Sequence, residues 1–145
     1  MEYSIGQVAQ RFGLTTHTLR YYDKEGLLSI RKNSSGLRRF SEEDINRLII
    51  IDCLKATGLR LKEIKHYFDL CRLGEQTLEE RRQLFYEQEK RLKQQLVELQ
   101  QNLARIEFKI KYYNEALRGG EKGIYERNAS LAAEKKKLFK IYPKN

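Results

Sequence analysis

Apolar residues recur every seven positions through the second half of the 145-residue sequence, and this repeat limits the fold more than any other feature. One series consists of Leu78, Phe85, Leu92, Leu99, Ile106 and Tyr113. A second series, four positions after the last four members of the first, consists of Leu96, Leu103, Ile110 and Leu117. Such spacing marks the d and a positions of a coiled-coil heptad. The repeat predicts one long dimerisation helix over residues 75–118.

The apolar seam of this helix needs a partner, because an isolated helix cannot cover it. A second copy of the chain is the simplest partner, so we predict a homodimer. Polar Arg82 and Glu89 at early a positions weaken the first part of the repeat. The alternative is an intramolecular helical hairpin, for which the sequence lacks a second long helix, and the heptads leave parallel and antiparallel pairing open. The expected dimer contacts are Leu92, Leu96, Leu99, Leu103, Ile106, Ile110, Tyr113 and Leu117.

The composition favours a mostly α-helical protein, with one Pro and no Trp in a chain rich in Leu, Glu, Lys and Gln. The longest uncharged apolar run, Leu48 to Ile51, is far shorter than the ~20 residues that span a bilayer, which argues against a membrane protein. The first four residues lack the layout of a secretion signal. We therefore expect a cytoplasmic protein whose two cysteines form no disulfide.

Positive charge is concentrated at the two ends of the sequence. Residues 1–40 and residues 119–145 each hold seven Lys and Arg against three Asp and Glu, whereas 41–73 and 74–118 are nearly balanced. A localised basic region is typical of a surface that meets a polyanion, because phosphate contacts dominate nucleic-acid affinity. A charge that only maintains solubility is the alternative, so local motifs must decide.

Two short helices are predicted near the N-terminus. Ser4 and Gln7 form a capping-box pattern for a helix over residues 5–11, and Gly13 separates it from a second helix that begins at residue 15 or 16 and ends near residue 24. This order indicates a helix-turn-helix. At 100° per residue, the outward face of the second helix is polar, aromatic and basic, as in a helix that enters the DNA major groove. Its predicted DNA contacts are Thr16, His17, Arg20, Tyr21 and Lys24.

A β-hairpin is predicted over residues 27–40, with its turn at residues 33–36. Its position directly after the helix pair is typical of a wing, and cations on both sides of the turn can bind the sugar-phosphate backbone. These cations are Arg31, Lys32, Arg38 and Arg39.

Three further segments complete the predicted order. Ser41 and Asp44 can cap a helix that is apolar nearly all round and should therefore be buried at the centre of the domain. A following helix should stop near Gly74. After the coil, residues 119–145 form a basic tail with a short helix over residues 129–139, in which the lysines at 135–137 are expected to be solvated. The predicted domains are thus 1–74, 75–118 and 119–145.

The order of these parts resembles the MerR family of bacterial transcription regulators over residues 1–118. The resemblance implies a winged helix-turn-helix dimer, joined by an antiparallel coiled coil, that distorts an over-long promoter spacer so that RNA polymerase can use it. The motifs that carry it are Tyr3-Ser4-Ile5-Gly6, Thr18-Leu19-Arg20-Tyr21-Tyr22-Asp23, Gly36-Leu37-Arg38-Arg39-Phe40 and Ser41-Glu42-Glu43-Asp44-Ile45.

The resemblance also implies roles for individual residues. Thr16, His17, Arg20 and Tyr21 match recognition-helix contacts, and Arg38 and Arg39 match wing contacts. The sequence departs from the family pattern at two positions of the wing, where Leu37 and Phe40 stand in place of tyrosines. Phosphate hydrogen bonds from those two hydroxyls are therefore not expected here.

The effector is less constrained. Residues 74–145 contain no Cys or His, which argues against metal sensing of the family type, and the segment after the coil is too short for a large drug-binding domain. Residues 53–58 and 106–113 resemble the branch that responds to aldehydes and thiol stress through one cysteine, and the matching residue is Cys53. Burial in the apolar central helix would instead make Cys53 inert packing, with Asp52 opposing and Lys55 favouring its thiolate. Cys71 is expected to be structural.

Alternative functions belong to other classes. An enzyme would need converging catalytic groups, but His17 and His66 lie on different predicted helices, so we expect no enzyme, cofactor or metal. A coiled-coil architectural DNA-binding protein would explain the basic head and the heptads, but not the polar recognition face. A regulator of the same family that senses a small molecule without a cysteine also remains open.

Overall fold

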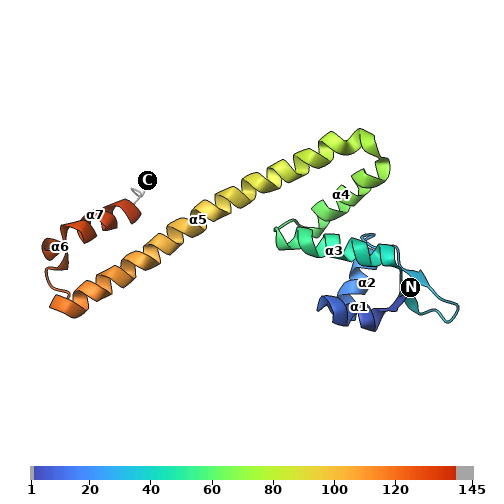
Figure 1. The fold of residues 1–145 in the computed structure, drawn as a ribbon, viewed down its shortest axis with the longest axis horizontal. Coiled ribbons are helices and arrows are strands. Elements are labelled where there is room, and N and C mark those ends of the chain that lie inside the picture. The colour runs from blue at the N-terminus through green and yellow to red at the C-terminus, as the bar shows by residue number, and fades with distance from the viewer. Residues whose placement is uncertain (1, 140–145) are drawn as a thin grey trace. The chain divides into compact units, whose positions relative to one another are not determined.

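The computed structural model describes residues 2–139, and most of them are helical, as predicted (Figure 1). The chain divides into two compact units, residues 1–89 and residues 90–145. Within residues 2–139, no helix has the length and apolar character needed to cross a membrane.

The first unit begins with the predicted helix pair, α1 (Ile5–Phe12) and α2 (Thr16–Lys24). The hydroxyl of Ser4 accepts from the Gln7 amide at 3.3 Å, and the Gln7 side chain accepts from the Ser4 amide at 2.8 Å, which completes the capping box. Gly13 ends α1 with φ of 62°, a left-handed conformation that glycine adopts without steric cost. Both helices match their predicted limits within one residue.

A three-stranded antiparallel sheet forms the wing and ties it to the N-terminus. The strands β1 (Tyr3–Ser4), β2 (Arg31–Lys32) and β3 (Arg38–Phe40) lie in the order β1-β3-β2. At the hairpin turn, the Asn33 carboxamide oxygen accepts from the amides of Ser35 and Leu37. The hairpin was predicted, but the pairing of β1 with β3 was not, because two residues carry no readable strand pattern.

Helices α3 (Glu42–Ala56) and α4 (Leu61–Leu73) complete the core of the first unit. The predicted cap of α3 is present, with the Ser41 hydroxyl accepting from the Asp44 amide at 3.2 Å. α4 ends at the predicted position, directly before Gly74. The core joins α1, α2, β3, α3 and α4, and its most buried members are Val8, Leu19, Leu27, Phe40, Ile45, Leu48, Ile51 and Ile64.

One prediction about α3 is wrong within this chain: the helix is not buried on all sides. Ile45, Leu48 and Ile51 are buried, but Ile49 and Ile50 are 50% and 39% exposed. Cys53 is exposed as well. Apolar residues at nearly every position of a helix do not reveal which side the chain covers. The exposed residues therefore form an apolar strip on α3.

The junction between α4 and the long helix α5 (Leu78–Gly119) is fixed by buried polar groups. A short 3₁₀ helix, Glu75–Thr77, lies between them, and the Thr77 hydroxyl donates to the Leu70 carbonyl at 2.7 Å. Further along α5, Gln88 is only 6% exposed, and its carboxamide nitrogen donates to the carbonyl of Thr57, the C-cap of α3. The first turns of α5 are thereby held on the end of α3.

The second unit consists of the rest of α5 with α6 (Ile124–Arg127) and α7 (Ala129–Leu138). The predicted short helix over residues 129–139 is confirmed as α7. The description of residues 119–145 as only a basic tail was incomplete. Ile124 and Leu131 pack with Phe108 of α5 in a second core, and these three side chains are only 1 to 3% exposed. The last six residues of that tail lie outside the described residues.

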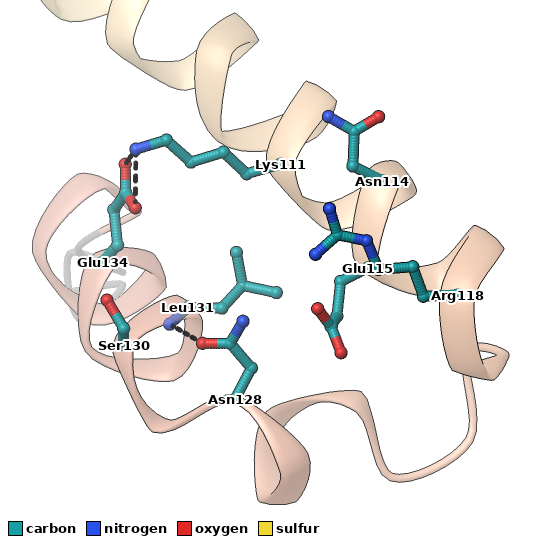
Figure 2. A pocket seen from close by; sticks show the side chains of 8 residues that line it. All are labelled: Lys111, Asn114, Glu115, Arg118, Asn128, Ser130, Leu131 and Glu134. Carbon is teal, nitrogen blue, oxygen red and sulfur yellow. Dashed lines mark hydrogen bonds and ion pairs between the residues drawn. The ribbon is translucent and has the colours of Figure 1, made fainter.

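α6 and α7 cover a face of α5 that lies mostly away from the heptad seam and borders it at Tyr113. Phe108, Tyr112 and Ala116 contact the tail, and at 100° per residue they lie on a side of the helix away from Ile106 and Ile110, with Tyr113 at the border between the two faces. Figure 2 shows Lys111 of α5 paired with Glu134 of α7, and the Asn128 side chain capping α7 at Leu131. The Lys111 ammonium lies 2.8 Å from the Glu134 carboxylate. The seam remains uncovered, with its predicted dimer contacts 39 to 86% exposed.

Candidate nucleic-acid interface

The outward face of α2 is exposed and cationic, as its residue spacing predicted. Leu19 and Tyr22 turn inward and are 0% and 2% exposed. The opposite face presents His17, Arg20, Tyr21 and Lys24 to solvent, with Thr16 half-buried at its first turn. Within residues 2–139, neither Arg20 nor Lys24 forms an ion pair. Their hydrogen-bond donors are therefore free for an outside acceptor.

A partly buried contact that the sequence did not indicate joins α2 to α3. The Lys55 ammonium donates to the Tyr22 hydroxyl at 2.9 Å and lies 5.6 Å from the centre of the Tyr22 ring. A buried tyrosine hydroxyl normally needs such a partner. The exposed face of α2 is thus held at a defined angle by the buried residues beneath it. Lys55, considered above as a neighbour of Cys53, serves Tyr22 instead.

The wing places like charges opposite each other. In the register of the hairpin, Arg31 stands opposite Arg39 and Lys32 stands opposite Arg38. Directly opposed like charges destabilise a strand pair. The two paired positions therefore add little stability to the hairpin. A polyanion that lies along the hairpin would remove the repulsion. The arrangement favours a phosphate backbone as the partner of the wing.

Arg38 differs from the other wing cations because it has a partner inside the unit. Its Nε donates to the Asp23 carboxylate of α2 at 3.0 Å, and both side chains are about three quarters buried. This ion pair joins the wing to the predicted recognition helix. Arg31 and Lys32 are exposed and Arg39 is half-buried, and within residues 2–139 none of these three forms an ion pair.

The wing also borders a hollow of about 500 Å³ at the start of α3. Arg31, Arg39 and Arg47 line it together with the carboxylates of Glu42 and Glu43. Nearby, the Tyr3 hydroxyl donates to Glu42 at 2.8 Å, and this hydrogen bond raises the pKa of the Tyr3 phenol. The carboxylates make this hollow less suitable for phosphate than the tip of the wing.

The departures of the wing from the family pattern have different consequences. Leu37 is 59% exposed, so its position can meet a ligand but offers no donor. Phe40 is fully buried and pairs with Tyr3 in the sheet. Position 40 therefore offers no phosphate contact in this chain, because the Phe40 side chain belongs to the core.

The two cysteines lie in different surroundings, and both are free thiols. Cys53 is exposed on α3, next to the apolar strip, rather than packed in a core. Cys71 is half-buried, with its sulfur 3.7 Å from a guanidinium nitrogen of Arg81. Burial raises the pKa of neighbouring Tyr67, and the Cys71 thiol adds to that rise. Arg81 also donates to the Gly74 carbonyl at 3.0 Å, so the surroundings of Cys71 close the end of α4.

The described residues offer no assembled metal site. Within residues 2–139, no three His, Cys, Asp or Glu side chains lie close enough together to hold an ion. The two histidines lie on different helices, and His66 has its Nε2 atom 3.6 Å from the Glu80 carboxylate.

A helix pair with an exposed cationic second helix, followed by a basic hairpin, defines a winged helix-turn-helix DNA-binding protein. The family model described as the MerR HTH family regulatory protein matches residues 3–71. An uncharacterised HTH-type transcriptional regulator of Haemophilus influenzae is 40% identical over 117 residues, which span 80% of this chain and 87% of the relative. The chain therefore belongs to the MerR family of DNA-binding transcriptional regulators.

Other relatives and solved structures agree with this assignment. The regulator AdhR of Bacillus subtilis is 38% identical over 61% of this chain and 64% of its own length. The structure of HiNmlR, a MerR family regulator lacking the sensor domain and bound to promoter DNA, is 39% identical. It matches with a TM-score of 0.71 over 86% of this chain and 96% of that chain. Because these relatives are regulators, the chain is not assigned an enzymatic activity.

Proposed function

We propose that two copies of the chain bind promoter DNA together and distort it so that RNA polymerase can use the promoter. The observation that carries this proposal is the surface formed by α2 and the wing, whose cations other than Arg38 form no ion pair within residues 2–139. Phosphate contacts are the main source of affinity for DNA. The similarity to a relative that was solved on promoter DNA supports the same role here.

The proposed contact residues form two groups: some read the base sequence, and others position the protein on the phosphate backbone. Base edges in the major groove are met by the exposed face of α2, where Arg20 can bind guanine with two hydrogen bonds. His17, Tyr21 and Lys24 lie beside it, with Thr16 at the first turn. Phosphates are met by the remaining wing cations, Arg31, Lys32 and Arg39. Arg38 positions the wing against α2 through Asp23 and meets phosphate only with its outer nitrogens.

The dimer is proposed to form along the heptad seam as an antiparallel coiled coil. The tail occupies a different face of α5, so the seam is free for a second helix. A continuous row of exposed Leu and Ile is costly to leave in water. The proposed division of labour is residues 1–74 for DNA, residues 75–118 for dimerisation and residues 119–145 as an appendage of the coil.

The finer proposal is that Cys53 senses reactive aldehydes or thiol stress. Exposure gives an electrophile access to the sulfur, which burial in a core would have denied. The thiol lies one helical turn before Thr57, whose carbonyl accepts from Gln88 of α5. An adduct on Cys53 would thus enlarge a side chain near the contact that joins α3 to the dimerisation helix. A shift of that contact can favour one of two arrangements of the DNA-binding heads.

Replacement of the thiol tests the sensor directly. Cys53→Ser is expected to keep dimerisation and promoter binding but to lose induction by formaldehyde or methylglyoxal in a transcription assay. Cys71→Ser is the matched control and should keep induction. Mass spectrometry after limiting aldehyde should find the adduct on Cys53. Full induction of the Cys53→Ser protein would favour the alternative, a family member that senses a small molecule without a cysteine.

Sequence selectivity separates the regulator from an architectural DNA-binding protein. Footprinting on the DNA upstream of its own gene should show protection of one site, and excess unrelated DNA should compete at least ~10³-fold less well. Equal competition by unrelated DNA would support the architectural alternative.

A further inference from the structure

The second unit contains a cavity whose lining has no part in the proposed DNA contacts. Some of its residues also belong to the second core. It measures about 340 Å³ and lies between α5 and the tail, on the flank of α5 that leads toward the heptad seam. We propose that this cavity binds a planar aromatic carboxylate. The volume falls within the range of small-molecule sites.

Aromatic rings from three segments surround the cavity. Tyr112 and Tyr113 come from α5, Tyr125 from α6, and Phe139 follows α7. The rings of Tyr112 and Tyr125 lie 5.9 Å apart, and those of Tyr112 and Tyr113 meet edge to face at 5.2 Å. Aromatic rings gain most from edge-to-face or offset contacts with another ring. The lining therefore favours a flat aromatic ligand over a flexible aliphatic one.

Two lysines give the cavity its preference for an anion. The Lys135 ammonium lies 4.4 Å from the centre of the Tyr125 ring, and the Lys109 ammonium lies 5.7 Å from that of Phe139. Within residues 2–139, neither lysine pairs with a carboxylate. Because both ammonium groups already occupy ring faces, a cationic ligand would be repelled. A carboxylate can instead accept hydrogen bonds from both lysines.

The acidic side chain at the rim does not cancel this charge. Glu121 accepts a hydrogen bond from the Tyr112 hydroxyl at 3.2 Å. Partial burial raises the pKa of the Tyr112 phenol, and this hydrogen bond adds to the rise, so Tyr112 stays neutral and continues to donate. The cavity keeps a net charge of one positive unit from two lysines and one carboxylate.

The polar hollow on the other flank of α5 provides a contrast (Figure 2). It measures about 360 Å³, and its lysine, Lys111, is already paired with Glu134 at 2.8 Å. Aromatic residues are absent from its lining. The combination of rings and unpaired lysines thus distinguishes the aromatic cavity.

Titration of the full-length chain with 2-naphthoate, in the absence of DNA, tests the proposal. Calorimetry should show saturable binding at one site per chain, and 2-naphthalenemethanol, which lacks the charge, should bind at least fivefold more weakly. Lys135→Gln and Lys109→Gln should each weaken naphthoate binding at least fivefold. Lys136→Gln, an exposed neighbour on α7 that does not line the cavity, is the matched control and should bind normally.

Three results would overturn this site. They are the lack of saturable binding, equal binding of the neutral alcohol, and unchanged binding by the Lys109→Gln/Lys135→Gln double variant. Circular dichroism of each variant should show the same helix content as the parent chain, so a loss of binding cannot be assigned to unfolding. None of these outcomes depends on promoter binding.

Discussion

Two helices of this protein each bury one face and expose another, but the exposed faces differ in chemistry. α2 exposes cations and a tyrosine, whereas α5 exposes a row of Leu and Ile. Charged groups lose little by facing water, while apolar groups lose about 25 cal/mol for each Å² left exposed. An intermittent partner therefore suits the face of α2, whereas the proposed dimer would cover the face of α5 permanently. The difference indicates DNA for the first and a second copy of the chain for the second.

The largest expected effect comes from a charge placed in the apolar row. Leu99→Asp would bury a carboxylate in the seam of both copies, which costs several kcal/mol. We expect a monomeric or partly unfolded protein by sedimentation, and promoter affinity reduced at least ~10²-fold because two linked heads no longer bind together.

A substitution on the opposite face provides the control for Leu99. Gln101→Asp adds the same charge at an exposed position away from the seam, and the dimer should persist. A Leu99→Asp protein that stays dimeric with an unchanged melting temperature would show that the two copies associate through another surface.

A smaller effect is expected when the cationic face of α2 loses its central arginine. Arg20→Ala should weaken binding to the cognate promoter by about 1–3 kcal/mol if the guanidinium binds a base. Electrophoretic mobility shifts on the promoter and on a scrambled sequence separate the two modes of contact, because loss of a phosphate contact lowers both affinities equally. Lys62→Ala removes an exposed cation from α4 and should change neither. Full affinity of the Arg20→Ala protein would remove α2 from the interface.

The smallest effect is expected when one of the opposed cations of the wing is removed. Affinity for the promoter should fall, whereas the free energy of unfolding should rise. Lys32→Gln should lower the salt dependence of promoter affinity by about one counterion per copy. It should also raise the free energy of unfolding by at most a few tenths of a kcal/mol, because Lys32 no longer faces Arg38, whose charge Asp23 already offsets in part. Affinity at several salt concentrations and urea unfolding measure the two changes. A lowered free energy of unfolding would mean that the pairing does not strain the hairpin.

Local signals in the sequence predicted the helices well. Capping residues such as Ser4, Thr15 and Ser41 and the turn glycine Gly13 act within a few residues of the chain, so their effect can be read directly. The heptad repeat predicted α5 to within three residues at its start and one at its end. The partition of α2 into a buried and an exposed face followed from helical periodicity alone.

Contacts between distant segments could not be predicted in the same way. The ion pair of Arg38 with Asp23 and the hydrogen bond of Lys55 with Tyr22 join residues 15 and 33 positions apart, and no periodicity records them. Exposure of Cys53 was missed because a helix apolar on all sides does not reveal which side is covered. The return of the tail onto α5 was missed because residues 119–145 have no repeat of their own.

The separation of the tail and the seam on different faces of α5 has a consequence for how such a protein can change over generations. A substitution at Phe108 or Leu131 alters the packing of the tail on α5 without changing the row that contains Leu99 and Leu103. The tail can therefore change in sequence while the residues of the proposed dimer seam are inherited unchanged. Selection on the tail contacts and selection on the proposed dimer seam therefore act on different residues of α5.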